Sequence, residues 1–122
     1  MSKSLSRYRT DAFRPQAGRC CYCTVLMWMN DGVSFARKHE LSSRVARWLR
    51  CTAEHLLARR DGGRDSRDNI VAACPVCNLR RHRGCTKAPT PDTSRTRVRQ
   101  RLERGRWHSP QVLRRGLISL QE

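Results

Sequence analysis

The sequence has few acidic residues, few aromatic residues and no long apolar run. Asp and Glu number 10 against 26 Lys and Arg, which gives the 122-residue chain a formal net charge of +16, and aromatic residues make up 6%. Met1 to Arg14 contains no apolar signal segment, and no run is long enough to cross a membrane. We therefore expect no membrane partner and a reducing, cytoplasmic compartment, where the cysteines serve as metal ligands or buried thiols.

The basic residues are mostly arginine. Arginine pairs bidentately with phosphate and stacks on bases, so a polyanion is the expected partner. Because the chain lacks a strongly hydrophobic amphipathic anchor, nucleic acid is a better candidate than a membrane surface. We expect double-stranded DNA, although the charge does not distinguish it from RNA and does not indicate an oligomeric state. No helix-turn-helix or separate zinc finger is recognisable, which favours weakly specific contacts to the DNA backbone.

Residues 51–84 form the stretch around which the chain is organised. Residues 51–57 mix β-compatible and apolar types, residues 61–63 read Asp-Gly-Gly, and residues 70–73 read as a short buried strand. Pro75 suits the first turn of a following helix and Gly84 suits its end. The expected order is strand, turn, strand, helix.

Four features of this stretch stand in a recognisable order. Glu54 and His55 end the first strand, Asn69 follows fourteen positions after His55, and Asn78 and His82 lie four apart on one face of the helix. In residue type, order and spacing they resemble the HNH endonuclease family. The resemblance implies a ββα-metal core, with Asn69 holding the loop and orienting His55.

The chemistry of phosphodiester cleavage gives each residue type a role. An enzyme must activate a water, stabilise negative charge on phosphorus and assist the leaving oxygen. Histidine ordinarily titrates near neutrality, so His55 is the candidate general base. Glu54 points to the opposite face of the strand from His55. Together with Asn78 and His82 it offers two oxygens and one nitrogen, a set that suits Mg²⁺ or Mn²⁺.

Each of these residues also has a simpler interpretation when taken alone. A Glu-His pair on a strand is often a surface pair, and Asn69 after Asp68 is often a turn residue. His82 stands among arginines and fits a solvated basic face. Their joint occurrence favours the nuclease hypothesis over a zinc-stapled nucleic-acid-binding module without cleavage, which remains the alternative.

Two Cys-x-x-C pairs bracket the predicted hairpin. Cys20 with Cys23 and Cys74 with Cys77 are expected to place four thiolates around a structural Zn²⁺. Cys21 competes with Cys20 by spacing alone, and the Cys-x-Tyr-Cys pattern of the resemblance favours Cys20. Of the remaining cysteines, Cys51 is expected to be a small buried residue on the first strand, and Cys85 is assigned no role.

The segments outside the core stretch are predicted from periodicity. Residues 25–29 read as a short strand closed by a turn at 30–32, and residues 41–49 as an amphipathic helix with Trp48 in the core. Residues 86–94 read as a linker. A basic helix capped near Thr93 or Ser94 and ended by Gly105 follows, and then a last helix from Ser109 and Pro110 through Val112, Leu113, Leu117 and Ile118.

The predicted fold class is α+β: a small ββα-metal core with a four-cysteine zinc site, an extra helix before it and a helical basic C-terminal arm. Residues 1–88 are expected to form the nuclease domain, and residues 89–122 to pack on it or contact DNA. The predicted activity is that of a metal-dependent DNA endonuclease or nickase. The arginines expected to contact DNA are Arg59, Arg60, Arg64, Arg80, Arg81, Arg83, Arg95, Arg97 and Arg99.

Overall fold

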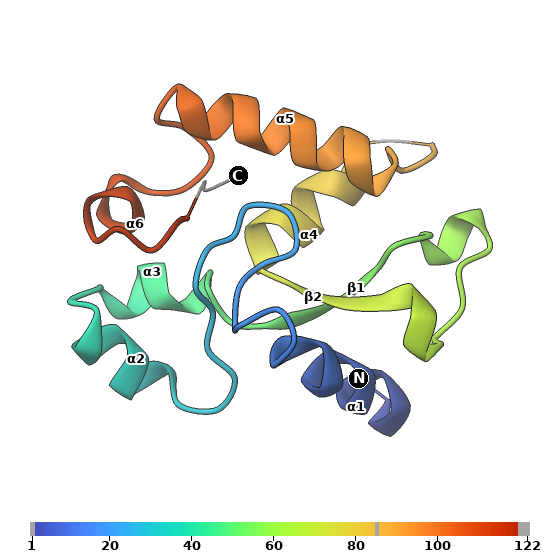
Figure 1. Ribbon diagram of the computed structural model, residues 1–122, viewed down its shortest axis with the longest axis horizontal. Coiled ribbons are helices and arrows are strands. Elements are labelled where there is room, and N and C mark those ends of the chain that lie inside the picture. Colours follow the sequence, from blue (N-terminus) through green and yellow to red (C-terminus); the bar gives the residue numbers. More distant parts are fainter. Residues whose placement is uncertain (1, 85, 120–122) are drawn as a thin grey trace.

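The computed structural model of the chain describes residues 2–84 and 86–119. Its centre is an antiparallel pair of strands, β1 (Thr52–His55) and β2 (Ile70–Ala73), with His55 opposite Ile70 and Thr52 opposite Ala73. Helix α4 (Pro75–His82) follows β2 directly and packs on β1, and α1 (Lys3–Phe13) packs on both strands (Figure 1). The α+β class and the strand, turn, strand, helix order are confirmed; Cys85 lies outside the described residues.

The connection between the strands contains two short 3-10 turns, Arg59–Asp61 and Arg67–Asn69. Gly62 has a φ of 100°, a conformation that residues with side chains rarely adopt. A Cβ on Gly63 would lie 1.7 Å from the carbonyl oxygen of Leu57. Both glycines are therefore required for the loop to fold back toward the end of β1.

Helix α4 begins at a cysteine and a proline. Cys74 is its N-cap and accepts a hydrogen bond from the amide of Cys77, and Pro75 occupies the first turn, where an N–H is not needed. The helix ends at His82, and Gly84 follows with a φ of 68°. The cysteine that caps this helix also belongs to the predicted metal site.

Residues 24–50 differ from the prediction. Residues 25–29 form only isolated bridges and no strand, because their backbone pairs with separate segments, Arg19 with Leu26 and Trp28 with Arg50. The turn expected at 30–32 instead starts a helix, α2 (Gly32–Lys38), capped by Asp31. Neither α2 nor the N-terminal helix α1 is indicated by the sequence pattern.

The helix expected over residues 41–49 is much shorter. Helix α3 spans Ser43–Arg47 and is capped by Ser42. The prediction that Trp48 packs in the core is wrong: it follows the helix as C-cap and is 45% exposed, whereas Leu41 and Leu49 are buried. The helix stops at Trp48, and the turn that follows sends Leu49 inward in its place.

The C-terminal segment shares the core. Helix α5 (Pro91–Glu103) begins earlier than predicted, capped by Thr90, and α6 (Pro110–Arg114) ends earlier than predicted, before Gly116 at a φ of 66°. One core cluster includes Val25 and Cys23 from the N-terminal half and four residues of this segment, Val98, Leu102, Val112 and Leu117. In the described part of the chain, no helix has the length and apolar character to span a membrane.

Candidate active site

Four buried thiols form a candidate metal centre. The sulfur atoms of Cys20, Cys23, Cys74 and Cys77 all lie within 4.8 Å of one another. Cys21 is not part of this group, so the structure decides between Cys20 and Cys21 in favour of Cys20. Burial opposes the ionisation of Cys20, but neighbouring cysteine thiols hydrogen-bond to it and hold its pKa well below the ordinary value. The four clustered sulfurs fit the tetrahedral coordination of structural Zn²⁺.

Backbone amides surround the sulfurs. The amide nitrogen of Cys74 lies 3.3 Å from Cys20 Sγ, and that of Tyr22 lies 3.5 Å from the same sulfur. The amide nitrogen of Val25 lies 3.5 Å from Cys23 Sγ. Such donors orient ligands and offset the negative charge of thiolates. The backbone around the two Cys-x-x-C pairs is thus arranged to orient the sulfurs as metal ligands.

Two side chains that the sequence did not indicate also reach this centre. Trp107 Nε1 donates to Cys77 Sγ at 3.2 Å, and His108 Nε2 lies 3.2 Å from Cys23 Sγ. Burial lowers the pKa of His108 to about 4, so the ring is neutral at neutral pH. Because a thiolate is an acceptor, we assign the His108 proton to Nε2. No spacing pattern links residues 107–108 to the two Cys-x-x-C pairs, which explains why these contacts were not predicted.

Glu54 is the buried centre of the second candidate site. Its side chain is 1% exposed, and its Oε2 accepts from Tyr22 Oη at 2.7 Å and from Arg81 Nη1 at 2.9 Å. Its Oε1 lies 2.9 Å from His82 Nε2. A buried carboxylate is tolerated only with such partners. Arg81 and Tyr22 hold one oxygen, so the other is presented toward His82.

Arg81 therefore does not belong to the exposed arginines with which we grouped it. Its side chain is 3% exposed, and besides Glu54 it donates to the carbonyl oxygens of His55, Leu56 and Pro89 at 2.7–2.9 Å. The guanidinium ties β1 to α4 and to the segment before α5. Its charge is used inside the protein and not for DNA.

Replacing Arg81 with methionine is expected to lower the free energy of unfolding by about 3–5 kcal/mol, because Glu54 would keep a buried charge without its ionic partner. Thermal or urea denaturation measures the change. The matched control is Arg83→Met, a substitution of an exposed arginine on the same helix end, which should change stability by less than about 0.5 kcal/mol. Equal stability of the two variants would show that the Arg81–Glu54 pair contributes nothing.

His55 is held by the loop between the strands. His55 Nε2 lies 2.7 Å from Asp65 Oδ1, and Arg59 binds the same carboxylate at 2.8 Å. The hydrogen bond with His55, with Arg59 beside it, holds the pKa of Asp65 below its usual range. Arg59 Nε also lies 3.3 Å from His55 Nε2. A carboxylate only accepts, so we assign the ring proton to Nε2, donating to Asp65, and the Nδ1 lone pair stays available.

Asn69 and Asn78 have different surroundings. Asn69 Oδ1 accepts from the amide of Leu57 at 2.8 Å, and its Nδ2 donates to the carbonyl oxygens of Leu57 and Arg64. It thereby closes the loop that carries Asp65. Asn78 Nδ2 donates to Thr52 Oγ1 and to the carbonyl of Ala53 on β1, which leaves Oδ1 for another partner.

The candidate residues meet in one cleft. It has a volume of about 250 Å³, and its lining includes Glu54, His55, Asn78 and His82, with Arg59 and Arg60. Asn69 does not line it and acts on the loop behind it. The order of these residues in the sequence predicted them. The sequence did not predict the contacts of Tyr22 and Asp65 or the burial of Arg81, because these depend on tertiary packing.

The remaining arginines predicted to contact DNA are exposed. Some are pre-oriented by neighbours: Arg95 lies over the Tyr22 ring and binds Asp92, and Arg80 lies over the Trp107 ring. The arginines that were predicted to contact DNA and are exposed are Arg59, Arg60, Arg64, Arg80, Arg83, Arg95, Arg97 and Arg99.

Comparison with known proteins gives one match. Residues 38–84 match the family model described as HNH endonuclease, and the matched segment contains β1, β2, α4 and the cleft residues Glu54, His55, Asn78 and His82. Neither the curated proteins nor the solved structures yield a match to the chain.

Proposed function

Because residues 38–84 match the HNH endonuclease family, we propose that this protein is a metal-dependent nuclease that hydrolyses phosphodiester bonds of DNA. The observation that carries the proposal is the gathering of Glu54, His55, Asn78 and His82 around one cleft. A protein that only binds nucleic acid has no need for a histidine, a buried carboxylate and two further ligand-type side chains at one place.

His55 is the general base in this proposal. With its Nε2 proton donated to Asp65, its Nδ1 lone pair can take a proton from the attacking water. Asp65 then stabilises the imidazolium that forms, as a carboxylate partner does for other catalytic histidines. Asn69 keeps the loop, and with it Asp65, in position. His55, Asp65 and Asn69 thus act as one unit.

Glu54, Asn78 and His82 would hold the catalytic divalent ion, Mg²⁺ or Mn²⁺. They fit such an ion because they offer a carboxylate oxygen, an amide oxygen and an imidazole nitrogen from one cleft. When bound, the ion supplies Lewis-acid stabilisation of the scissile phosphate and the leaving oxygen. Tyr22 and Arg81 fix the orientation of Glu54, and the β1 backbone fixes the amide of Asn78.

The four cysteines would hold a structural Zn²⁺ in the same proposal. Cys74 and Cys77 belong to the first turn of α4, and Asn78 follows immediately. Fixing this turn therefore fixes where Asn78 and His82 point. The exposed arginines would contact the phosphates of the DNA backbone around the cleft. The affinity for DNA would then depend strongly on the salt concentration.

The direct test is cleavage of supercoiled plasmid by zinc-loaded protein without added metal, with Mg²⁺, with Mn²⁺, and with excess chelator after the zinc content has been verified. The proposal expects nicked or linear DNA only with the divalent ion. DNA binding without cleavage under every metal condition would instead support the zinc-stapled binding module.

Asn78→Ala and His82→Ala are expected to raise the Mn²⁺ concentration needed for half-maximal cleavage by about 10- to 100-fold, because each removes a ligand or the group that orients it. Cleavage should recover in part at high Mn²⁺. Asn30→Ala, which replaces an exposed asparagine outside the cleft, is the matched control. Metal dependence identical to the control would remove the two residues from the ligand set. Glu54→Ala is less suitable, because it would also leave Arg81 buried without its partner.

A further inference from the structure

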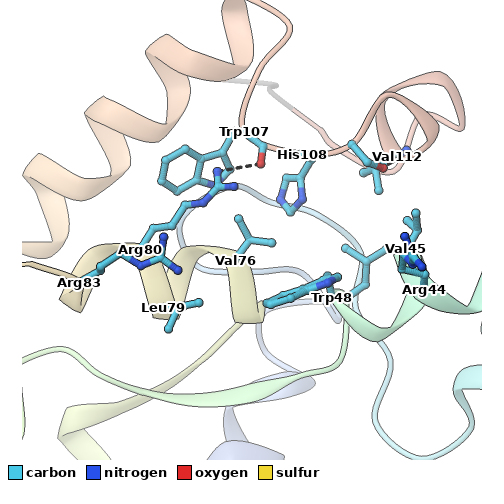
Figure 2. Close-up of a pocket in the computed structure, with 12 residues that line it drawn as sticks. Arg44, Val45, Trp48, Val76, Leu79, Arg80, Arg83, Trp107, His108 and Val112 are labelled. Atoms are coloured by element: carbon cyan, nitrogen blue, oxygen red, sulfur yellow. Dashed lines mark hydrogen bonds between the residues drawn. The ribbon is translucent and has the colours of Figure 1, made fainter.

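A second pocket opens beside the candidate active site (Figure 2). Its volume is about 430 Å³, within the range of about 300–1,000 Å³ in which proteins bury small organic groups. Helix α4 contributes Val76 and Leu79, the end of α3 contributes Trp48, and the segment before α6 contributes Trp107 and His108.

The pocket exposes flat and apolar surface. Trp48 is 45% exposed and Leu79 is 47% exposed, among the few large apolar side chains that the described part of the chain leaves at the surface. Figure 2 shows the Trp48 ring on the opposite side of the pocket from Trp107 and His108, with Val76 between them. A flat group that enters the pocket therefore has an aromatic ring available for stacking.

The rim of the pocket is positively charged. Arg44, Arg80 and Arg83 line it and are exposed, and no acidic side chain lines it among the residues that the structure describes. Arg80 is pre-oriented, because its guanidinium lies 4.7 Å from the centre of the Trp107 ring and donates to the Trp107 carbonyl at 3.0 Å. Aromatic surface surrounded by arginines is the combination that binds the bases and the phosphates of an unpaired strand.

Helix α4 connects the pocket to the cleft. Asn78 and His82 line the cleft, whereas Val76, Leu79 and the C-cap Arg83 line the pocket. The cleft and the pocket are thus built in part from the same short helix.

We propose that the pocket binds one unpaired base of the DNA strand next to the cleavage site, stacked on Trp48, with Arg44 and Arg83 on the flanking phosphates. This inference rests on the proposed nuclease function and names its preferred substrate class. A base that is already unpaired enters such a pocket without the cost of breaking a base pair. DNA with a bulge or a single-stranded segment is therefore bound in preference to perfect duplex.

The test uses fluorescence anisotropy with the full-length His55→Ala protein, so that cleavage does not disturb binding. Three DNA duplexes of the same length are compared: one with a single-nucleotide bulge, one with an abasic residue in that bulge, and one perfectly paired. The expected result is about tenfold tighter binding of the bulge that carries a base than of the abasic bulge, as one stacked base contributes. Trp48→Ala abolishes this difference and Trp48→Phe, which keeps an aromatic ring, retains most of it.

Val33→Ala, which replaces an exposed apolar residue outside the pocket, is the control and keeps the difference. Equal affinity for the base-containing and abasic bulges, or an unchanged difference in Trp48→Ala, overturns the proposal. The proposal is also overturned if sedimentation shows that the unaltered protein is a dimer and that Trp48→Ala is a monomer, because Trp48 would then lie between two copies of the chain. A protein that never cleaves plasmid but shows the Trp48-dependent preference refutes the nuclease function alone. Cleavage without that preference refutes only the pocket.

Discussion

Replacing His55 with alanine is expected to lower the rate of plasmid cleavage by about 10²- to 10⁴-fold, the range that a positioned general base contributes. In the proposed mechanism the imidazole acts on the attacking water. Among the residues that the structure describes, its side-chain partners are Asp65 and Arg59 in the exposed loop, so its loss should not disturb the core. DNA affinity and thermal stability should stay close to those of the unaltered protein. Single-turnover cleavage together with anisotropy separates the two quantities.

His39→Ala is the matched control for His55. His39 lies at the end of α2, its ring 4.5 Å from the ring of Phe35, and it does not line the cleft. Its removal should leave cleavage unchanged. If His55→Ala retained activity within a few-fold of the control, another group would have to serve as the base. Asp65→Asn provides an intermediate case, because it keeps the shape of the loop but weakens the stabilisation of the imidazolium.

Replacing Cys74 with serine is expected to release the structural metal and unfold most of the protein. Apparent binding free energies of structural zinc are about 10–16 kcal/mol, which is comparable to the whole stability of a small domain, about 5–15 kcal/mol. Cys74 is fully buried and also caps α4. Elemental analysis and circular dichroism of the purified variant measure the two effects. Cys20→Ser, Cys23→Ser and Cys77→Ser should behave in the same way.

Cys21→Ser is the matched control, because Cys21 stands next to a ligand but is not part of the four-sulfur group. It should retain one equivalent of zinc and the native spectrum. A Cys74→Ser protein that is metal-free yet fully folded would show that the core of Leu49, Val25 and their neighbours holds the fold without the metal.

Local backbone signals predict part of the fold, and long-range contacts decide the rest. The hairpin and α4 were predicted because Gly62 and Gly63 allow a turn that few other residues can form, and Pro75 fixes a φ that suits the first turn of a helix. The strand expected over residues 25–29 does not form, since its backbone pairs with several separate segments, at Arg19, Arg50 and Leu117, and not with one neighbouring strand. Helix α1 was not predicted because Leu5 is its one buried residue among those described and its packing on the sheet is long-range.

The sequence by itself determined the candidate site residues and their order: two Cys-x-x-C pairs, Glu54-His55, and Asn78 with His82 on one helical face. These follow from local spacing, because residues three or four apart on a helix and two apart on a strand have fixed directions. Only the tertiary structure decided which partners surround them. It buried Arg81 against Glu54, set Asp65 behind His55, and brought Trp107 and His108 to the cysteines. Such contacts join residues far apart in the chain, and their identity depends on how the helices pack, which no local pattern encodes.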